Sequence, residues 1–197
     1  MPAWHEHRAR VRVSSARREM SARRLGWRGR QRRGGELRRE APVPQIIGRR
    51  LPDLVLPFAP EGEIGLGELA RRFSLVVCLF PALGTEHADS EERARAAAWG
   101  RYQPTAIKLG HRLVAISSDN PAHQHDWLET EAPDYLVLCD RQLLLARDLG
   151  LPTIRRDRRR VYQAATLVIQ NARVQQVFSP VWVNDAMNTI QYLKDQQ

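Results

Sequence analysis

Side chains that could do chemistry gather in the segment LFPALGTEHADSEE, residues 79–92. Glu86, His87 and Asp89 stand close together in it, and an imidazole that is oriented by a carboxylate can act as a general base. Asp89 and Ser90 also suit a helix N-cap, and Glu91 and Glu92 would then lie near the positive end of the helix dipole. The segment therefore has two interpretations, a non-redox acid–base site and a well-capped helix start.

Two further histidines, His123 and His125, lie in the segment NPAHQHDW. With His87 and its acidic neighbours they could hold a metal ion, but their spacing matches no zinc-site pattern and the chain has no CxxC. The alternative interpretation of the pair is an exposed helix face. We therefore predict neither a metal nor a cofactor.

The chain has two cysteines, Cys78 and Cys139, which are too few for a disulfide framework and fit a reducing cytoplasm. Cys78 lies inside an apolar run, where burial would raise the pKa of the thiol and leave it inert. Cys139 precedes Asp140 at the end of a short predicted strand. It has two interpretations, a displaced reactive thiol and a small buried core residue. Nothing in the sequence favours a disulfide between the two cysteines.

Charge is distributed unevenly along the 197 residues, whose net charge is +9. Residues 1–45 hold 13 arginines and four glutamates and account for all of it, while residues 46–197 hold 18 basic and 18 acidic side chains. We predict a disordered Arg-rich extension over 1–45, because it has too few periodic apolar residues to offset its chain entropy. Its interpretations are contact with nucleic acid or anionic lipid, organelle targeting, and an extension without function.

Residues 46–197 alternate strands with helices and predict one α/β domain. The apolar run SLVVCLF, residues 74–80, is typical of a strand buried on both faces, and a hairpin is expected around Asn171 and Ala172. A thioredoxin-like arrangement, a mixed sheet with helices on both faces, fits this order. No apolar stretch approaches the roughly 20 residues of a membrane span. The other main expected elements are strands at 111–118 and 134–140 and helices at about 89–109, 121–131, 141–150 and 184–196.

Five short motifs follow one another along the chain in a familiar order: IGRRLPDLVLP, VVCLFPALGT, LVAISSDNPAHQHDW, YLVLCDRQLLLARDLGLPT and ATLVIQNARVQQVFSPV. Together they resemble the peroxiredoxin family, the thiol peroxidases of the alkyl hydroperoxide reductase and thiol-specific antioxidant group. The resemblance covers roughly residues 47–195. It implies a peroxiredoxin-type, thioredoxin-like fold for the domain.

The resemblance also assigns a role to each residue of a former active-site loop. Pro81 and Thr85 match the family's Pro and Thr, and Glu91 matches its Glu or Gln. The family's reaction needs a thiolate, whose pKa is lowered by a helix N-terminus and an Arg. Ala88 stands at the position of the peroxidatic cysteine, and Ala164 stands at that of the supporting Arg. The resemblance thus implies a degenerate member without the standard nucleophile.

We therefore expect a protein that has lost thiol peroxidase activity and serves as a binding or regulatory module or as a repurposed pathway enzyme. The alternatives are a residual thiol-dependent oxidoreductase that uses Cys139 or Cys78, and an acid–base enzyme that uses His87. The run Arg155–Arg160 is predicted to be a loop that could present an anion-binding patch near the former active site. With the extension, it favours a phosphate-bearing partner or nucleic acid, and the resemblance implies that the chain can form a homodimer.

Overall fold

The computed structural model describes residues 46–59, 61–84, 88, 90–131, 133–179 and 184–197. The Arg-rich extension over 1–45 lies outside these residues, so its disorder and its partners stay predictions. In the part of the chain that the structure describes, no helix is both long and apolar enough to span a bilayer.

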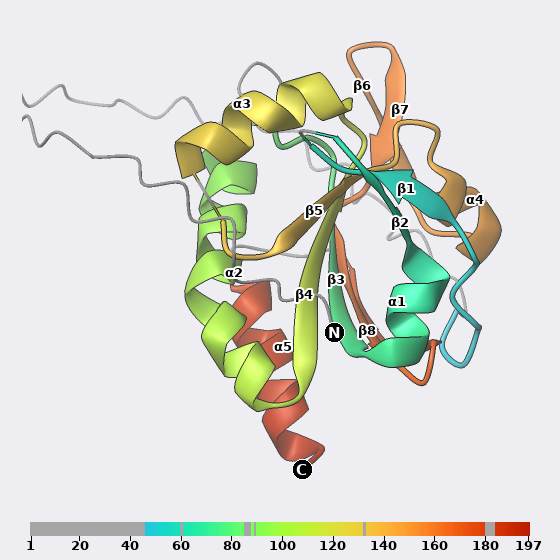
Figure 1. The fold of residues 1–197 in the computed structure, drawn as a ribbon, viewed down its shortest axis with the longest axis vertical. Coiled ribbons are helices and arrows are strands. Elements are labelled where there is room, and N and C mark those ends of the chain that lie inside the picture. Colours follow the sequence, from blue (N-terminus) through green and yellow to red (C-terminus); the bar gives the residue numbers. More distant parts are fainter. Residues whose placement is uncertain (1–45, 60, 85–87, 89, 132, 180–183) are drawn as a thin grey trace, which may run out of the picture. The chain divides into compact units, whose positions relative to one another are not determined.

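A five-stranded mixed sheet forms the centre of the domain (Figure 1). Its strand order is β5-β4-β3-β8-β9; β3 runs parallel to β4 and antiparallel to β8, while β4 runs parallel to β5. The predicted central strand is confirmed, because every residue of its apolar run from 75 to 80 is buried. The strands are β3 (Ser74–Phe80), β4 (His111–Ser117), β5 (Leu136–Cys139), β8 (Ala165–Gln170) and β9 (Arg173–Phe178).

Helices cover both faces of this sheet, as the thioredoxin-like prediction required (Figure 1). One face packs on α2 (Ser90–Lys108), α3 (Pro121–Glu131) and α5 (Asp185–Asp195) through side chains such as Trp99 and Trp127. The opposite face packs on α1 (Leu66–Arg72) and α4 (Leu144–Leu149). Alternate residues of β3 enter the two cores, which is the consequence of a strand's two-residue period.

Two short antiparallel ribbons lie outside the central sheet. The first pairs β1 (Val55–Pro57) with β2 (Glu63–Gly65). The second pairs β6 (Thr153–Arg156) with β7 (Arg159–Tyr162), so the predicted loop over Arg155–Arg160 is wrong and this run is a hairpin. The prediction failed because a ribbon made largely of arginine has no apolar alternation to mark it as a strand pair.

The two hairpin turns share one backbone geometry. Asn171 and Ala172 have φ angles of 51° and 56°, which confirms the predicted tight turn between β8 and β9. Asp157 and Arg158, between β6 and β7, have φ angles of 47° and 65°. Positive φ at both central residues is the pattern of a type I′ turn, whose second position favours glycine.

Replacing Arg158 with glycine should therefore stabilise the protein. The exposed arginine holds a left-handed conformation that costs an L-residue roughly 1–2 kcal/mol, and glycine adopts it freely. We expect Arg158→Gly to raise the free energy of unfolding by about 0.5–1 kcal/mol in urea denaturation, after the larger entropy of unfolded glycine is subtracted. Arg155→Gly, inside β6, is the matched control and should lower it. Equal effects of the two substitutions would contradict this account of the turn.

Candidate functional site

The loop that joins β3 to α2 is fixed from two sides. A carboxylate oxygen of Asp119 accepts hydrogen bonds from the backbone N–H groups of Leu83 at 2.6 Å and Gly84 at 2.8 Å. A Cβ atom on Gly84 would lie 2.8 Å from the Cβ of His123, so only glycine allows the loop to approach α3 this closely. Pro81 at the start of the loop is buried. The sequence keeps the geometry of a loop that presents the start of a helix.

Ala88 is the residue that the resemblance assigns to the peroxidatic position. It is 7% exposed, and its backbone N–H donates to the Gly84 carbonyl at 2.9 Å. Its methyl group supplies neither a nucleophile nor a base. Thr85, Glu86, His87 and Asp89 lie outside the described residues, so the predicted acid–base interpretation of this segment stays a prediction.

The first turn of α2 presents two adjacent glutamates in different surroundings. Glu91, which the resemblance placed in the site, is exposed. Glu92 is 8% exposed, and its two carboxylate oxygens accept hydrogen bonds from one guanidinium nitrogen of Arg156 at 2.8 and 3.0 Å. Arg156 belongs to β6, so the β6–β7 hairpin contacts the first turn of α2. The positive charge of Arg156 is therefore paired with the negative charge of Glu92.

A buried guanidinium lies beneath the helix start. Arg95, on α2, is 3% exposed and donates to the Leu79 carbonyl of β3 at 2.8 Å and to the Ala165 carbonyl of β8 at 3.0 Å. It also forms an ion pair with Asp185 of α5, with 2.9 Å between Nε and Oδ2. Its guanidinium carbon lies 4.4 Å from the centre of the Phe80 ring, a distance typical of a cation–π contact.

This arginine lies next to the position from which the family's supporting Arg would come. Ala164 itself is half-buried and precedes Ala165, whose carbonyl Arg95 contacts. Arg95 was not predicted from the sequence, although its position on the buried face of α2 could have indicated it. Glu92, Arg95, Ala96 and Trp99 form the buried stripe of α2 at helical spacing, and an arginine on such a stripe indicates a paired cation.

Both thiols are buried. Burial raises the pKa of Cys78 well above its ordinary value, Asp185 adds to this effect, and Arg95 opposes it. Burial also raises the pKa of Cys139 to about 12, and its Sγ donates to Oε1 of Gln124 at 2.9 Å. Burial and the raised pKa of each thiol favour the buried-core interpretation of both cysteines.

A disulfide between the two cysteines is excluded by the sheet. Cys78 belongs to β3 and Cys139 to β5, and β4 lies between these strands. Neighbouring strands lie about 4.8 Å apart, so two strand spacings, roughly 9.6 Å, exceed the Cα separation of about 7 Å that a disulfide tolerates. Both cysteines are free.

Of the side chains weighed as possible metal ligands, His123 and His125 are described, while Glu86, His87 and Asp89 lie outside the described residues. His125 lies on α3 beside Glu129, with 3.3 Å between Nε2 and Oε1, and its side chain is 44% exposed. His123 is half-buried against the Gly84 loop. Among the residues that the structure describes, no group of three or more His, Cys, Asp or Glu side chains could hold a metal ion.

Removing Asp185 tests the buried ion pair. We expect Asp185→Ala to lower the free energy of unfolding by about 3–5 kcal/mol in urea denaturation, because it leaves the Arg95 guanidinium buried without its counter-ion. The control is Glu68→Ala, which removes an exposed partner of Arg72 at 3.6 Å and should cost less than about 1 kcal/mol. Arg95→Met combined with Asp185→Ala should cost less than the sum of the two single changes. Similar losses for Asp185→Ala and Glu68→Ala would contradict the buried pairing.

Comparison with known proteins identifies the fold. No protein-family model matches the chain, and no curated protein matches it. Solved structures of peroxiredoxins do match the chain. One is reduced Prx3 from Vibrio vulnificus in complex with hydrogen peroxide, with a TM-score of 0.66 and 17% sequence identity. The match covers 76% of this chain and 96% of the Prx3 chain. Peroxidoxin BcpB from Mycobacterium tuberculosis has a TM-score of 0.66 and 18% identity, with 77% and 97% covered. A PrxQ variant from Xylella fastidiosa has a TM-score of 0.66 and 13% identity, with 76% and 96% covered.

These similarities confirm the fold part of the sequence prediction. The structural neighbours span nearly their whole length on this chain, and identities below 20% tie the likeness to the arrangement of strands and helices. The domain has the mixed sheet and flanking helices of a peroxiredoxin-type, thioredoxin-like fold.

Proposed function

We propose that this chain is a peroxiredoxin-like protein without thiol peroxidase activity, which acts as a binding or regulatory module. The observation that carries the proposal is Ala88, a buried methyl group at the helix start that the loop is built to present. A peroxidase of this type must attack the peroxide oxygen with a thiolate, and an alanine side chain cannot form that bond.

The charges around the loop support the same conclusion. A peroxidatic thiol needs a positive field that lowers its pKa. Two arginines near the start of α2 are paired with carboxylates, Arg95 with Asp185 and Arg156 with Glu92. These carboxylates oppose the charge that the two arginines could offer to a thiolate, and Ala164 stands at the supporting position.

The two enzymatic alternatives have less support. A residual thiol oxidoreductase would need Cys78 or Cys139 to ionise and to meet a substrate, and both thiols are buried with a raised pKa. An acid–base enzyme would rest on His87 with Glu86 and Asp89. No contact of the described residues favours that reaction, and Glu91 is exposed.

Peroxide consumption in the presence of a thiol reductant tests the proposal. We expect the full chain to consume hydrogen peroxide no faster than the reductant alone, since it offers no accessible thiolate. Cys78→Ser and Cys139→Ser are the matched variants and should give the same rate as the unchanged chain. Turnover that disappears in one of these two variants would assign the reaction to that thiol and overturn the proposal.

A further inference from the structure

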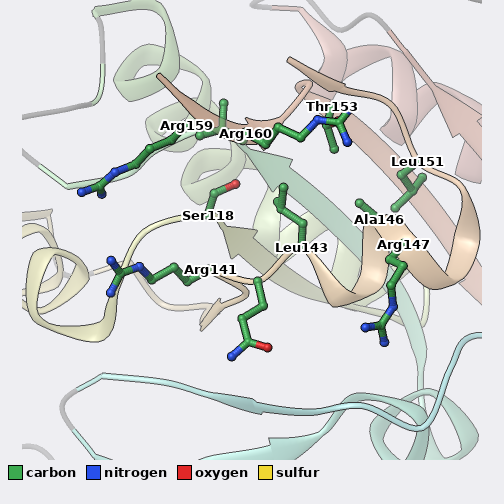
Figure 2. A pocket seen from close by; sticks show the side chains of 11 residues that line it. Ser118, Arg141, Leu143, Ala146, Arg147, Leu151, Thr153, Arg159 and Arg160 are labelled. Atoms are coloured by element: carbon green, nitrogen blue, oxygen red, sulfur yellow. The ribbon is translucent and has the colours of Figure 1, made fainter. Parts of the chain in front are cut away.

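A pocket of about 640 Å³ opens beside the hairpin β6–β7 (Figure 2). One wall comes from Ser118, just after β4, and from residues 141–147, which form a turn and the first part of α4. The other comes from β7 and from residues 151 and 153. This volume lies within the range of roughly 300–1,000 Å³ that is typical of small-molecule sites. The pocket is separate from Ala88, although Ser118 in its wall is the neighbour of Asp119, which holds the Ala88 loop.

Four arginines line this pocket, and none of the described residues that line it is acidic. Arg147 has a neighbouring carboxylate, with 2.9 Å between its Nε and Oδ1 of Asp148. Arg141, Arg159 and Arg160 make no side-chain hydrogen bond or ion pair with another residue of the structure's described part. In a domain whose basic and acidic side chains are equal in number, this is a local excess of positive charge.

The arginines come from two walls and can act on one ligand. Figure 2 shows Arg141 and Arg159 on either side of Ser118, with their guanidinium groups extended in the same direction. Each guanidinium presents several N–H donors in a planar fork that suits phosphate oxygens. Ser118 lies between these two side chains, and its Oγ accepts from the backbone N–H of Tyr162 at 2.9 Å.

The walls are joined by a buried hydrogen-bond network behind the pocket. Asp140 is 2% exposed, and its carboxylate accepts from the backbone N–H groups of Leu144 and Leu145, each at 2.9 Å. The Tyr162 hydroxyl also donates to this carboxylate. Burial, and to a lesser extent the nearby Asp140 charge, raises the pKa of Tyr162, so the hydroxyl stays protonated and can donate. Asp140 and Tyr162 thus fix the α4 turn and β7 relative to each other, as a preformed site requires.

The floor between the arginines is apolar. Leu143 has a φ angle of 55°, a left-handed conformation that is rare for leucine and is found where the surrounding structure holds strain. Its side chain lines the pocket together with Ala146, Leu151 and Val161. A ligand for this pocket therefore combines an anionic group with an uncharged organic part.

We propose that this pocket binds a small organic phosphate or diphosphate, with the phosphate between Arg141 and Arg159 and the organic part against the Leu143 floor. The proposal does not depend on the loss of peroxidase activity, because none of these residues belongs to the Ala88 loop. A small molecule is favoured over nucleic acid because the charge lines a concave, partly apolar pocket, whereas a nucleic-acid backbone is followed by an extended basic surface.

Calorimetric titration of the full chain at physiological ionic strength tests this site with adenosine diphosphate, pyrophosphate and adenosine as probes. We expect adenosine diphosphate to bind, pyrophosphate to compete with it, and adenosine to bind at least about tenfold more weakly, because charge-assisted hydrogen bonds to phosphate supply the affinity. Arg141→Gln and Arg159→Gln should each weaken diphosphate binding about tenfold or more. Both side chains are exposed, so the folded state should persist, and thermal melting of the unliganded variants checks this.

The control variant is Arg101→Gln, which removes an exposed arginine of α2 and should leave binding unchanged. Equal losses in all three variants would make the binding a non-specific effect of surface charge, and binding that survives both pocket substitutions would place the phosphate contacts outside this pocket. Either result would overturn the proposal. Failure of adenosine diphosphate to bind while a single-stranded oligonucleotide binds would overturn it in favour of nucleic acid. None of these outcomes changes the peroxide assay, so the two proposals fail separately.

Discussion

Arg95 places a charged guanidinium in the interior of the domain, where three separate elements supply its partners. It projects from α2, donates to carbonyl oxygens of β3 and β8, and pairs with Asp185 at the start of α5. Thr166 of β8 also contacts both partners, because its hydroxyl accepts from Arg95 at 3.0 Å and donates to Asp185 at 2.7 Å. A buried charge without such partners costs several kcal/mol, so these contacts restrict how the helices can lie on the sheet.

The same interaction limits the chemistry of the loop above it. A thiol near Arg95 would ionise more easily beside a cation whose charge is not already neutralised. The Arg95 charge is neutralised by Asp185, whose Oδ2 lies 2.9 Å from the Arg95 Nε. Cys78 lies on β3 within this surrounding, and burial keeps its pKa raised despite the nearby guanidinium. The peroxiredoxin-type fold thus holds a paired charge near the start of α2, and under the proposed function Ala88 stands where the thiol of a peroxidase would be.

The sequence predicted those elements whose patterns depend on neighbouring residues. The apolar run of β3 marked a strand buried on both faces, and the turn at Asn171 and Ala172 has the backbone that was expected. The hairpin over Arg155–Arg160 was missed because its strands carry no apolar alternation. The order of the motifs assigns roles to Pro81 and Ala88, and these assignments stay predictions.

Interactions between distant parts of the chain could not be predicted in the same way. Arg95 and Asp185 are 90 residues apart, and no local pattern pairs them. Arg141 and Arg159 line one pocket only because Asp140 and Tyr162 join the α4 turn to β7 through a buried hydrogen bond. Such sites depend on tertiary packing, which cannot be predicted from the spacing of residue types along one sequence.

The central claim is that the folded chain holds no reactive thiolate. Alkylation by iodoacetamide at pH 9.0 tests this claim directly, because an ordinary cysteine is half ionised at that pH. Mass spectrometry then counts the labels on each chain. The account predicts that the native chain stays unlabelled, because burial keeps Cys78 and Cys139 protonated and inaccessible, and that urea-unfolded chain takes up a label on each cysteine. Rapid labelling of either cysteine in the native chain would contradict it.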